Sequence, residues 1–150
     1  MSSDSNDSNV KISEVFHLTI SAEINPSEDP EKVKSAILRI FPGVEISVRG
    51  KCVLGETTNP VVMENLHQLL LRQQILDAAR RIFKEGITGS ERINFMIHRQ
   101  AAAVGRLSFV SSMDESPLGP IEVQVYHTDI LGFIDHVAPK WAWIKPKSEK

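Results

Sequence analysis

The stretch LRQQILDAARRIFK, residues Leu71–Lys84, decides most about the fold of this chain. Its apolar residues recur at the spacing of one helix face, and they are Leu71, Ile75, Leu76, Ala79, Ile82 and Phe83. This stripe predicts a helix with one side packed against a core. The basic residues project elsewhere, with Asp77 as the only acidic residue among them. A cationic helix docked on a sheet offers a surface for nucleic acid, although many solvated helices share the pattern.

The helical spacing extends toward the N-terminus from this stretch. Apolar residues keep it from Val62 to Phe83, which predicts one long helix or two short ones joined near Arg72. Pro60 suits the first turn and Gly86 the C-terminal cap. Residues 86–90, GITGS, resemble a phosphate loop in composition alone. They lack the Gly-Lys-Ser/Thr ending and follow a helix instead of preceding one.

Alternation of apolar and polar residues predicts strands around this helical region. Residues 16–24 alternate over nine positions, which predicts a half-buried strand. Asp29-Pro30 then suits the cap and first position of a helix that Pro42-Gly43 ends. Residues 44–49 predict a second strand, with Gly50 expected as a bulge before the strand continues. Later strands are expected around residues 93–97, 107–109 and 121–125.

A last helix is predicted, with either Thr128 or Asp129 as its cap and with Pro139 at its end. The elements then follow the order β-α-β-α-β-β-β-α, without the regular alternation of a doubly wound parallel sheet. This order predicts an α+β fold, a two-layer sandwich with a mixed or mainly antiparallel sheet and helices on one face. We expect residues 10–150 to form a single domain, preceded by a disordered polar tail over residues 1–9.

The composition is that of an ordinary globular protein, with 41% hydrophobic and 24% charged residues among 150. Cys52 is the only cysteine, which excludes an internal disulfide and a CxxC zinc or redox site. The first residues lack the apolar stretch of a signal peptide, and no run approaches the length of a membrane span. We therefore expect a cytoplasmic protein without a membrane partner.

The net charge of −2 conceals two oppositely charged regions. Between Met1 and Glu31, seven acidic residues stand against one lysine, so this region carries −6. Between Arg72 and Arg106, seven basic residues stand against three acidic ones, so this region carries +4. Such a positive region can focus a local potential that attracts phosphate. Its basic residues form the candidate nucleic-acid site: Arg72, Arg80, Arg81, Lys84, Arg92, Arg99 and Arg106.

These cations have a second interpretation, in which acidic neighbours hold some of them in ion pairs. The candidate partners are Asp77, Glu85, Glu91 and the acidic N-terminal strand. Arg80 and Arg81 also cannot both point the same way, because adjacent helix positions diverge. Aromatic platforms for single-stranded RNA are few, since Phe95 and Phe109 fit the core and Tyr126 is the only tyrosine. Contacts to the backbone of a structured RNA are therefore the mode we expect.

One group of histidines and aspartates is a candidate set of metal ligands, and its members are His127, Asp129, Asp135 and His136. No third ligand has a fixed spacing, and such residues are common near helix ends, so we expect neither a metal nor a cofactor. No nucleophile elbow or triad spacing is present. Cys52 at a strand end fits a partly buried, inert thiol. The sequence therefore predicts a protein that is not an enzyme.

The C-terminal segment carries both tryptophans of the chain, Trp141 and Trp143, followed by Ile144. Large apolar side chains are unfavourable in water, and chain ends stay frayed unless they dock. We therefore predict that this segment is ordered and contributes to a dimer contact, or else folds back onto its own sheet.

Five segments of the chain resemble an uncharacterised family of archaeal proteins. They are INPSEDPEKV at residues 24–33, IFPG at 40–43, LRQQILDAAR at 71–80, RQAAAVG at 99–105 and SPLGPIEV at 116–123. Members of that family are described as RNA-binding proteins with a fold like that of a large-subunit ribosomal protein. The resemblance covers most of the chain and implies a two-layer α+β fold, dimerisation and a connection to RNA. It assigns no functional residues.

Two functions of different kinds follow. The first is non-enzymatic binding of RNA or a ribonucleoprotein through a basic helix and strand face. The second is a structural homodimer or protein-interaction module that binds no nucleic acid. A contiguous positive surface over the second helix favours the first function, whereas arginines consumed in ion pairs beside an exposed apolar patch favour the second.

Overall fold

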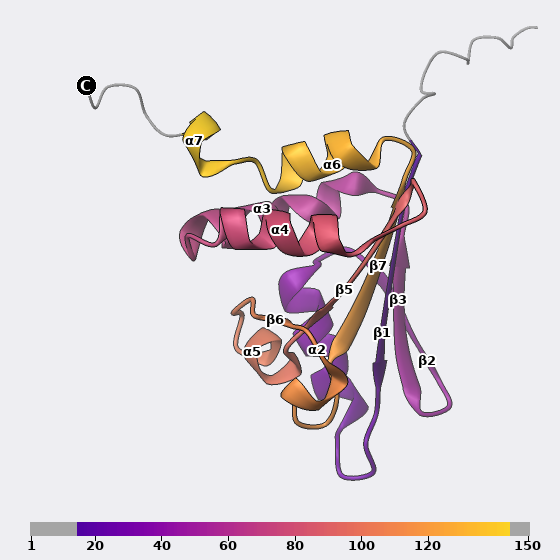
Figure 1. The fold of residues 1–150 in the computed structure, drawn as a ribbon. Coiled ribbons are helices and arrows are strands. Elements are labelled where there is room, and N and C mark those ends of the chain that lie inside the picture. The colour runs from indigo at the N-terminus through magenta and orange to yellow at the C-terminus, as the bar shows by residue number, and fades with distance from the viewer. Residues whose placement is uncertain (1–14, 145–150) are drawn as a thin grey trace, which may run out of the picture.

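The helices all lie on one side of a seven-stranded sheet in the computed structural model, which describes residues 15–144 (Figure 1). The elements in chain order are β1 (Phe16–Glu23), α2 (Pro30–Ile40), β2 (Glu45–Arg49), β3 (Cys52–Thr57), η1 (Pro60–Val62), α3 (Met63–Arg72), α4 (Leu76–Glu85), β4 (Ile87–Thr88), β5 (Arg92–Ile97), α5 (Arg99–Ala103), β6 (Phe109–Val110), η2 (Met113–Glu115), β7 (Ile121–His127), α6 (Ile130–Val137) and α7 (Trp141–Ile144). The α+β prediction is confirmed. The tail predicted over residues 1–9 lies outside the described residues.

Every strand pairs antiparallel to its neighbours, in the order β2-β3-β1-β7-β5-β4. β6 also lies against β5, so the outer edge of β5 carries two short strands. β4 pairs with Arg92 and Ile93 at the start of β5, and β6 pairs with Met96 and Ile97 at its end. The sequence predicts a mixed or mainly antiparallel sheet, and the described sheet is antiparallel throughout.

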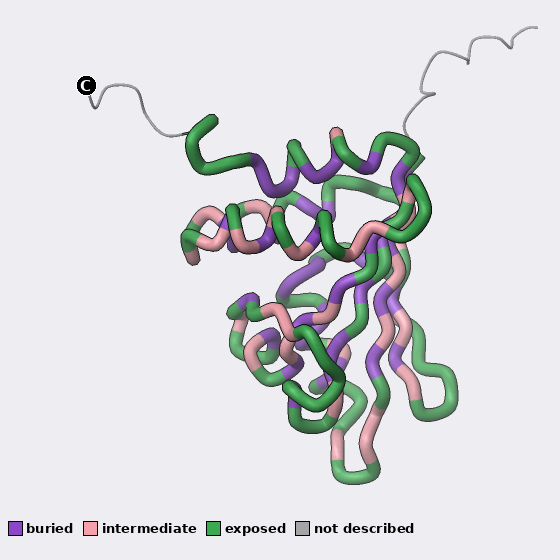
Figure 2. Tube along the Cα trace, in the orientation of Figure 1, coloured by how far each residue is buried: buried purple, intermediate pink, exposed green. Residues whose placement is uncertain are grey.

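The two faces of the sheet differ in burial, as Figure 2 shows along the central strands. Leu18 and Ile20 of β1 are buried and lie opposite Val125 and Val123 of β7 on the face that the helices cover. The alternate residues, such as Thr19, belong to the other face and are partly or fully exposed. The period-two pattern seen in the sequence therefore separates a core face from an uncovered face.

The helices bury the apolar stripes that the sequence predicts. Asp29 caps α2, because its carboxylate accepts the backbone N–H of Glu31 at 3.0 Å, and Pro30 occupies the first helical position. Val33 and Ile37 of α2 are then buried against the sheet. Asp129 caps α6 in the same way, through the backbone N–H of Gly132.

The predicted long helical segment is two helices, one of the two expected arrangements. α3 ends at Arg72 and α4 begins at Leu76, with Gln74 between them at a positive φ of 58°. The side chain of Gln73 exchanges two hydrogen bonds of 2.8 Å with the backbone of Leu107. Because these bonds hold Gln73 against a distant loop, the chain turns there instead of continuing as one helix.

The expected bulge at Gly50 is wrong. Gly50 and Lys51 form a two-residue turn between β2 and β3, which pair along five residues from Glu45 to Arg49. The backbone N–H of Ile24 donates to the carbonyl of Lys51, so β3 pairs with β1 as well as with β2. The pairing of β2 with β3 makes residues 44–57 a hairpin rather than one interrupted strand. The positive φ of Gly50 suits such a turn.

Three short elements have no counterpart among the predictions: β4, the five-residue helix α5, and the 3-10 turn η2. The last segment, Trp141–Ile144, forms the short helix α7. It folds back onto α4 and not onto the sheet, because the backbone N–H of Trp141 donates to the carboxylate of Asp77. Among residues 15–144 no helix has the length and apolar character needed to cross a membrane.

Candidate nucleic-acid interface

The centre of the predicted basic surface lies on α4. Leu76, Ala79 and Phe83 turn inward and are buried, which directs Arg81 and Lys84 toward the surface. Its C-terminal end is fixed on the sheet, because the backbone N–H of Asn94 donates to the carbonyl of Gly86 at 2.9 Å. A Cβ atom at Gly86 would overlap the carbonyl oxygen of Asn94, so only glycine permits this close approach.

Five of the seven predicted cations are exposed, and they are Arg72, Arg81, Lys84, Arg92 and Arg106. Arg81 faces Glu85 across 3.6 Å, in an exposed pair that contributes little. Arg92 precedes the buried Ile93 on β5, so its side chain lies on the uncovered face, away from α4. Arg72 ends α3 and Arg106 follows α5, so the structure does not gather all five into one patch.

Arg80 is the first of two cations that the fold holds internally. Its guanidinium pairs with the carboxylate of Asp135 at 2.7 Å and donates to the carbonyl of Ala138 at 3.2 Å. It also lies over the ring of Trp143, 4.9 Å from the centroid, and its side chain is only 12% exposed. Arg80 therefore joins α4 to α6 and α7.

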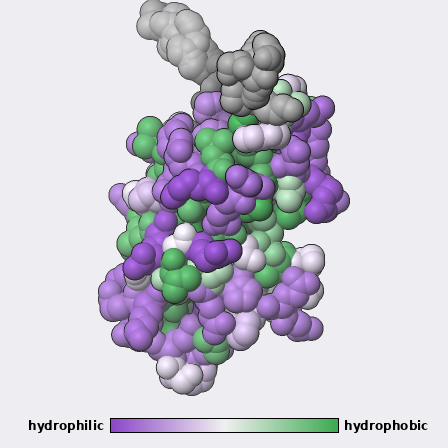
Figure 3. Space-filling model, turned by 90° about the vertical axis from the view of Figure 1, so that its left-hand side faces the viewer, coloured by the Kyte–Doolittle hydropathy of each residue, from purple (hydrophilic) through white to green (hydrophobic). Residues whose placement is uncertain are grey.

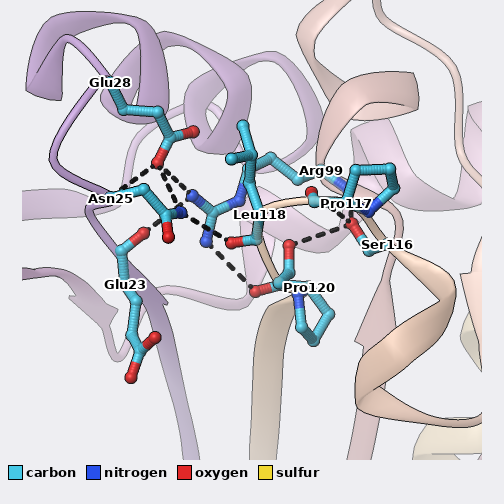
Figure 4. A network of polar contacts seen from close by, with 9 residues as sticks. Glu23, Asn25, Glu28, Arg99, Ser116, Pro117, Leu118 and Pro120 are labelled. Atoms are coloured by element: carbon cyan, nitrogen blue, oxygen red, sulfur yellow. Dashed lines mark hydrogen bonds and ion pairs between the residues drawn. The ribbon is translucent and has the colours of Figure 1, made fainter.

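Arg99 is the second, and it is almost fully buried (Figure 4). One guanidinium nitrogen donates to the carboxylate of Glu28 at 2.6 Å and to the carbonyl of Glu23 at 2.7 Å. The other donates to the carbonyl of Pro120 at 3.5 Å, while Nε has no partner among residues 15–144. The backbone N–H of Arg99 donates to the hydroxyl of Ser116. This network ties α5 to the ends of β1 and β7.

The pKa of Glu28 shows how strongly this network favours a charged carboxylate. Burial of the carboxyl group raises its pKa. Hydrogen bonds from the backbone of Asn25, from Arg99 and from the side chain of Asn25 together lower the pKa by more than burial raises it. The net result is a pKa below the ordinary value. Glu28 and Arg99 thus remain a charged pair inside the protein, and the guanidinium is not presented to the surface.

A groove between α4 and α7 brings several cations together. It has a volume of about 580 Å³ and is lined by Asp77, Arg80, Arg81, Lys84, Glu85, Lys140 and Ala142. Trp143 stands beside it with 54% of its surface exposed, and the ammonium group of Lys140 lies 5.6 Å from the centre of its ring. Figure 3 shows this side of the molecule, on which hydrophilic residues predominate around smaller hydrophobic patches. We call this site the α4–α7 groove.

Lys140 and Trp143 were not among the predicted site residues. The sequence holds a signal for them, because both belong to a C-terminal segment that combines lysines with tryptophans. Their position beside α4 depends on the docking of that segment through Asp77 and Arg80. Spacing along the chain does not reveal this contact.

The histidines and aspartates near α6 each have a different neighbour. The ring of His127 accepts the backbone N–H of Asp129, whose own side chain caps α6. Asp135 pairs with Arg80, and His136 lies 3.9 Å from Glu64. Within the described part of the chain, no three His, Cys, Asp or Glu residues are grouped to hold a metal ion.

Relatives of this chain occur in archaea. A UPF0201 protein from Metallosphaera sedula is 39% identical over 132 residues, which cover 86% of this chain and 92% of that protein. Another from Aeropyrum pernix is 36% identical over 137 residues, covering 89% of this chain and 91% of that protein. The chain belongs to the UPF0201 family. The family model that matches residues 17–127 is described as RNA binding. The resemblance to an archaeal family is confirmed.

Solved structures of UPF0201 proteins share the fold. The crystal structure of the UPF0201 protein from Methanococcus jannaschii matches with a TM-score of 0.70 at 33% identity, over 83% of this chain and 93% of that chain. A second UPF0201 crystal structure matches with a TM-score of 0.74 at 30% identity, over 83% and 94%. The antiparallel sheet with its helical layer is therefore the UPF0201 fold.

Proposed function

We propose that this UPF0201 protein is a cytoplasmic, non-enzymatic protein that binds RNA or a ribonucleoprotein through the α4–α7 groove. The observation that carries the proposal is the convergence of Arg80, Arg81, Lys84 and Lys140 on one groove. The RNA-binding description of the matching family model supports it. Lysine and arginine displace counterions from phosphates, which supplies most of the affinity of sequence-independent RNA binding.

The cations of the groove have separate parts in this proposal. Arg81 and Lys84 are exposed on α4, and Lys140 approaches from the other wall, so these three provide the phosphate contacts. Arg80 is shielded and already paired, so it holds the walls together. Asp77 and Glu85 reduce the positive potential, which favours binding to an extended phosphate backbone over tight capture of one phosphate.

The remaining predicted cations take a peripheral place. Arg72, Arg92 and Arg106 are exposed away from the groove and can contact outlying phosphates of a larger RNA. Arg99 would act indirectly, by fixing α5 against the sheet, since its guanidinium is enclosed by protein.

The test measures RNA affinity at several salt concentrations for the wild type and for the triple variant Arg81→Gln, Lys84→Gln, Lys140→Gln. Structured and single-stranded RNA are both used, with fluorescence anisotropy as the readout. Each lost phosphate contact should reduce the slope of log affinity against log salt by about 0.7 to 0.9. We therefore expect the triple variant to bind more weakly at low salt and to lose about two to three units of slope.

Lys32→Gln is the control, because Lys32 is exposed on α2 and lines neither the α4–α7 groove nor the edge of the sheet. It removes one positive charge outside the groove and should leave the salt dependence almost unchanged. A wild type that binds no RNA more tightly than about millimolar at low salt would refute the proposal. Equal slopes for the triple variant and the control would show that RNA binds elsewhere.

The alternative function, a structural homodimer or protein-interaction module, has one observation in its favour. Arg80 and Arg99 are held in ion pairs with Asp135 and Glu28, as expected if basic residues serve the fold. Absence of RNA binding together with a stable dimer in solution would favour this function over the first.

A further inference from the structure

β2 is the long free edge of the described sheet. It pairs with β3 along five residues on one side and has no strand on the other, whereas β4 and β6 cover the opposite edge of the sheet. Val48 in the middle of β2 is 45% exposed. An uncovered strand of this length presents a row of backbone donors and acceptors that another strand can pair with.

We propose that a second copy of this chain pairs with β2, antiparallel and centred on Ser47, so that two sheets join into one. The proposal is independent of RNA binding, because β2 lies at the far edge of the sheet from the α4–α7 groove. The partner follows from the backbone direction and the side-chain order of β2 itself.

The backbone of β2 points the required groups outward. The N–H of Ile24 in the β1 segment donates to the carbonyl of Lys51, which shows that odd-numbered residues of the β3 segment face β1. Cys52 and Leu54 therefore bond to β2, where they lie opposite Arg49 and Ser47. The N–H and C=O groups of Ile46 and Val48 must then point away from β3.

A pairing centred on Ser47 uses these outward groups fully. It places Ile46 of each copy opposite Val48 of the other, and both residues point their backbone groups toward the partner. Four inter-chain backbone hydrogen bonds result around the two-fold axis. The same pairing sets two apolar side chains against each other on the core side of the sheet, including the exposed Val48.

The charged ends of β2 are self-complementary in this register. Glu45 of each copy lies opposite Arg49 of the other, which gives two opposite-charge pairs on the uncovered face. Within one chain, Glu45 lies opposite Glu56 of β3, a like-charge arrangement, and Glu56 already contacts His17 at 2.9 Å. A guanidinium from the second copy would offset this repulsion. Self-complementarity of this kind is what a two-fold interface requires.

A charge swap tests the partner and the register together. Arg49→Glu and Glu45→Arg each place like charges opposite one another twice, so each should weaken self-association by about ten-fold or more. The double variant Glu45→Arg, Arg49→Glu restores both pairs and should restore the wild-type dissociation constant. Sedimentation equilibrium over a wide range of protein concentrations measures these constants, because a short edge interface is weak.

Two further variants control for folding and for unrelated charge effects. Val48→Pro removes an outward N–H that β3 does not use, so the monomer should keep its melting temperature while the dimer is lost. Arg92→Glu makes the same charge change elsewhere on the uncovered face and should leave the dimer intact. A wild type that stays monomeric throughout overturns the proposal. A double variant that associates as weakly as the single variants also overturns the proposal. That result would indicate a register centred on Val48, in which residue 45 lies opposite Lys51 of the second copy.

Discussion

The Arg99 network and the α4–α7 groove use the same residue type in different ways. In the network, the Arg99 side chain is 4% exposed and its partner Glu28 is 14% exposed. In the groove, Arg81 and Glu85 also form an ion pair, but both are about two-thirds exposed. Water therefore screens the second pair and not the first. The comparison shows that depth within the fold, and not the charge pattern of the sequence, separates structural cations from available ones.

Removing Arg99 should give the largest effect. Arg99→Ala leaves the carboxylate of Glu28 buried without its partner, so we expect the free energy of unfolding to fall by about 3–5 kcal/mol. Urea denaturation measures this change. Arg106→Ala removes an exposed arginine and should change stability by less than about 0.5 kcal/mol. Similar losses of unfolding free energy in the two variants would show that buried and exposed arginines contribute alike to stability.

Gly86→Ala tests how the groove is fixed to the sheet. The added methyl group overlaps the carbonyl oxygen of Asn94, and a backbone atom cannot move aside as a flexible side chain can. We expect a loss of about 1–3 kcal/mol in unfolding free energy. Gly89→Ala is the comparison, since a Cβ there meets nothing within 4 Å and only its positive φ of 68° opposes the change. A smaller loss at Gly86 than at Gly89 would contradict the close approach.

Arg80→Ala probes the joint between α4 and α7. The change removes an ion pair to Asp135 and a contact with Trp143, so we expect a loss of about 1–2 kcal/mol. Tryptophan fluorescence should shift toward longer wavelength, because both tryptophans lie in the helix that Arg80 holds. Arg81→Ala should leave the fluorescence unchanged. A spectrum that responds equally to both substitutions would show that Arg80 does not anchor α7.

The smallest expected effect concerns acid stability. A carboxyl group whose pKa is lower in the folded protein contributes stability above its unfolded pKa and loses it as the pH falls through the folded pKa. Glu28 is such a group. Unfolding free energies should therefore decline below about pH 4.3, and less steeply in Glu28→Gln than in the wild type. Parallel declines in the two proteins would show that Glu28 does not titrate as proposed.

Local patterns in the sequence predicted the parts of the fold that depend on neighbouring residues. The alternation of residues 16–24 defines β1, and Asp29-Pro30 starts α2, because strand faces and helix caps are set within a few residues. The turn at Gly50 differs from the predicted bulge, since a glycine suits both a bulge and a hairpin. The hairpin forms because β2 and β3 pair with each other across the turn, and such pairing is not set by the residues next to the glycine.

The candidate site was harder to predict for the same reason. Glu28, which holds Arg99, lies 71 residues away in the sequence, and Asp135, which holds Arg80, belongs to a different helix. The basic stripe of α4 was visible as a pattern, and its exposed members Arg81 and Lys84 remain in the proposed site. Lys140 joins them only because α7 docks on α4. Long-range contacts thus decide which members of a charge cluster reach the surface.

The division of the outer edge of β5 between two short strands limits how the protein can assemble. β4 and β6 have two residues each, too few to recruit a further chain by hydrogen bonding. Among the strands of residues 15–144, β2 is therefore the one from which the sheet can be extended. When two copies meet through β2, neither keeps a long open strand. The assembly is then self-limiting: it stops at two chains and cannot propagate into a fibre.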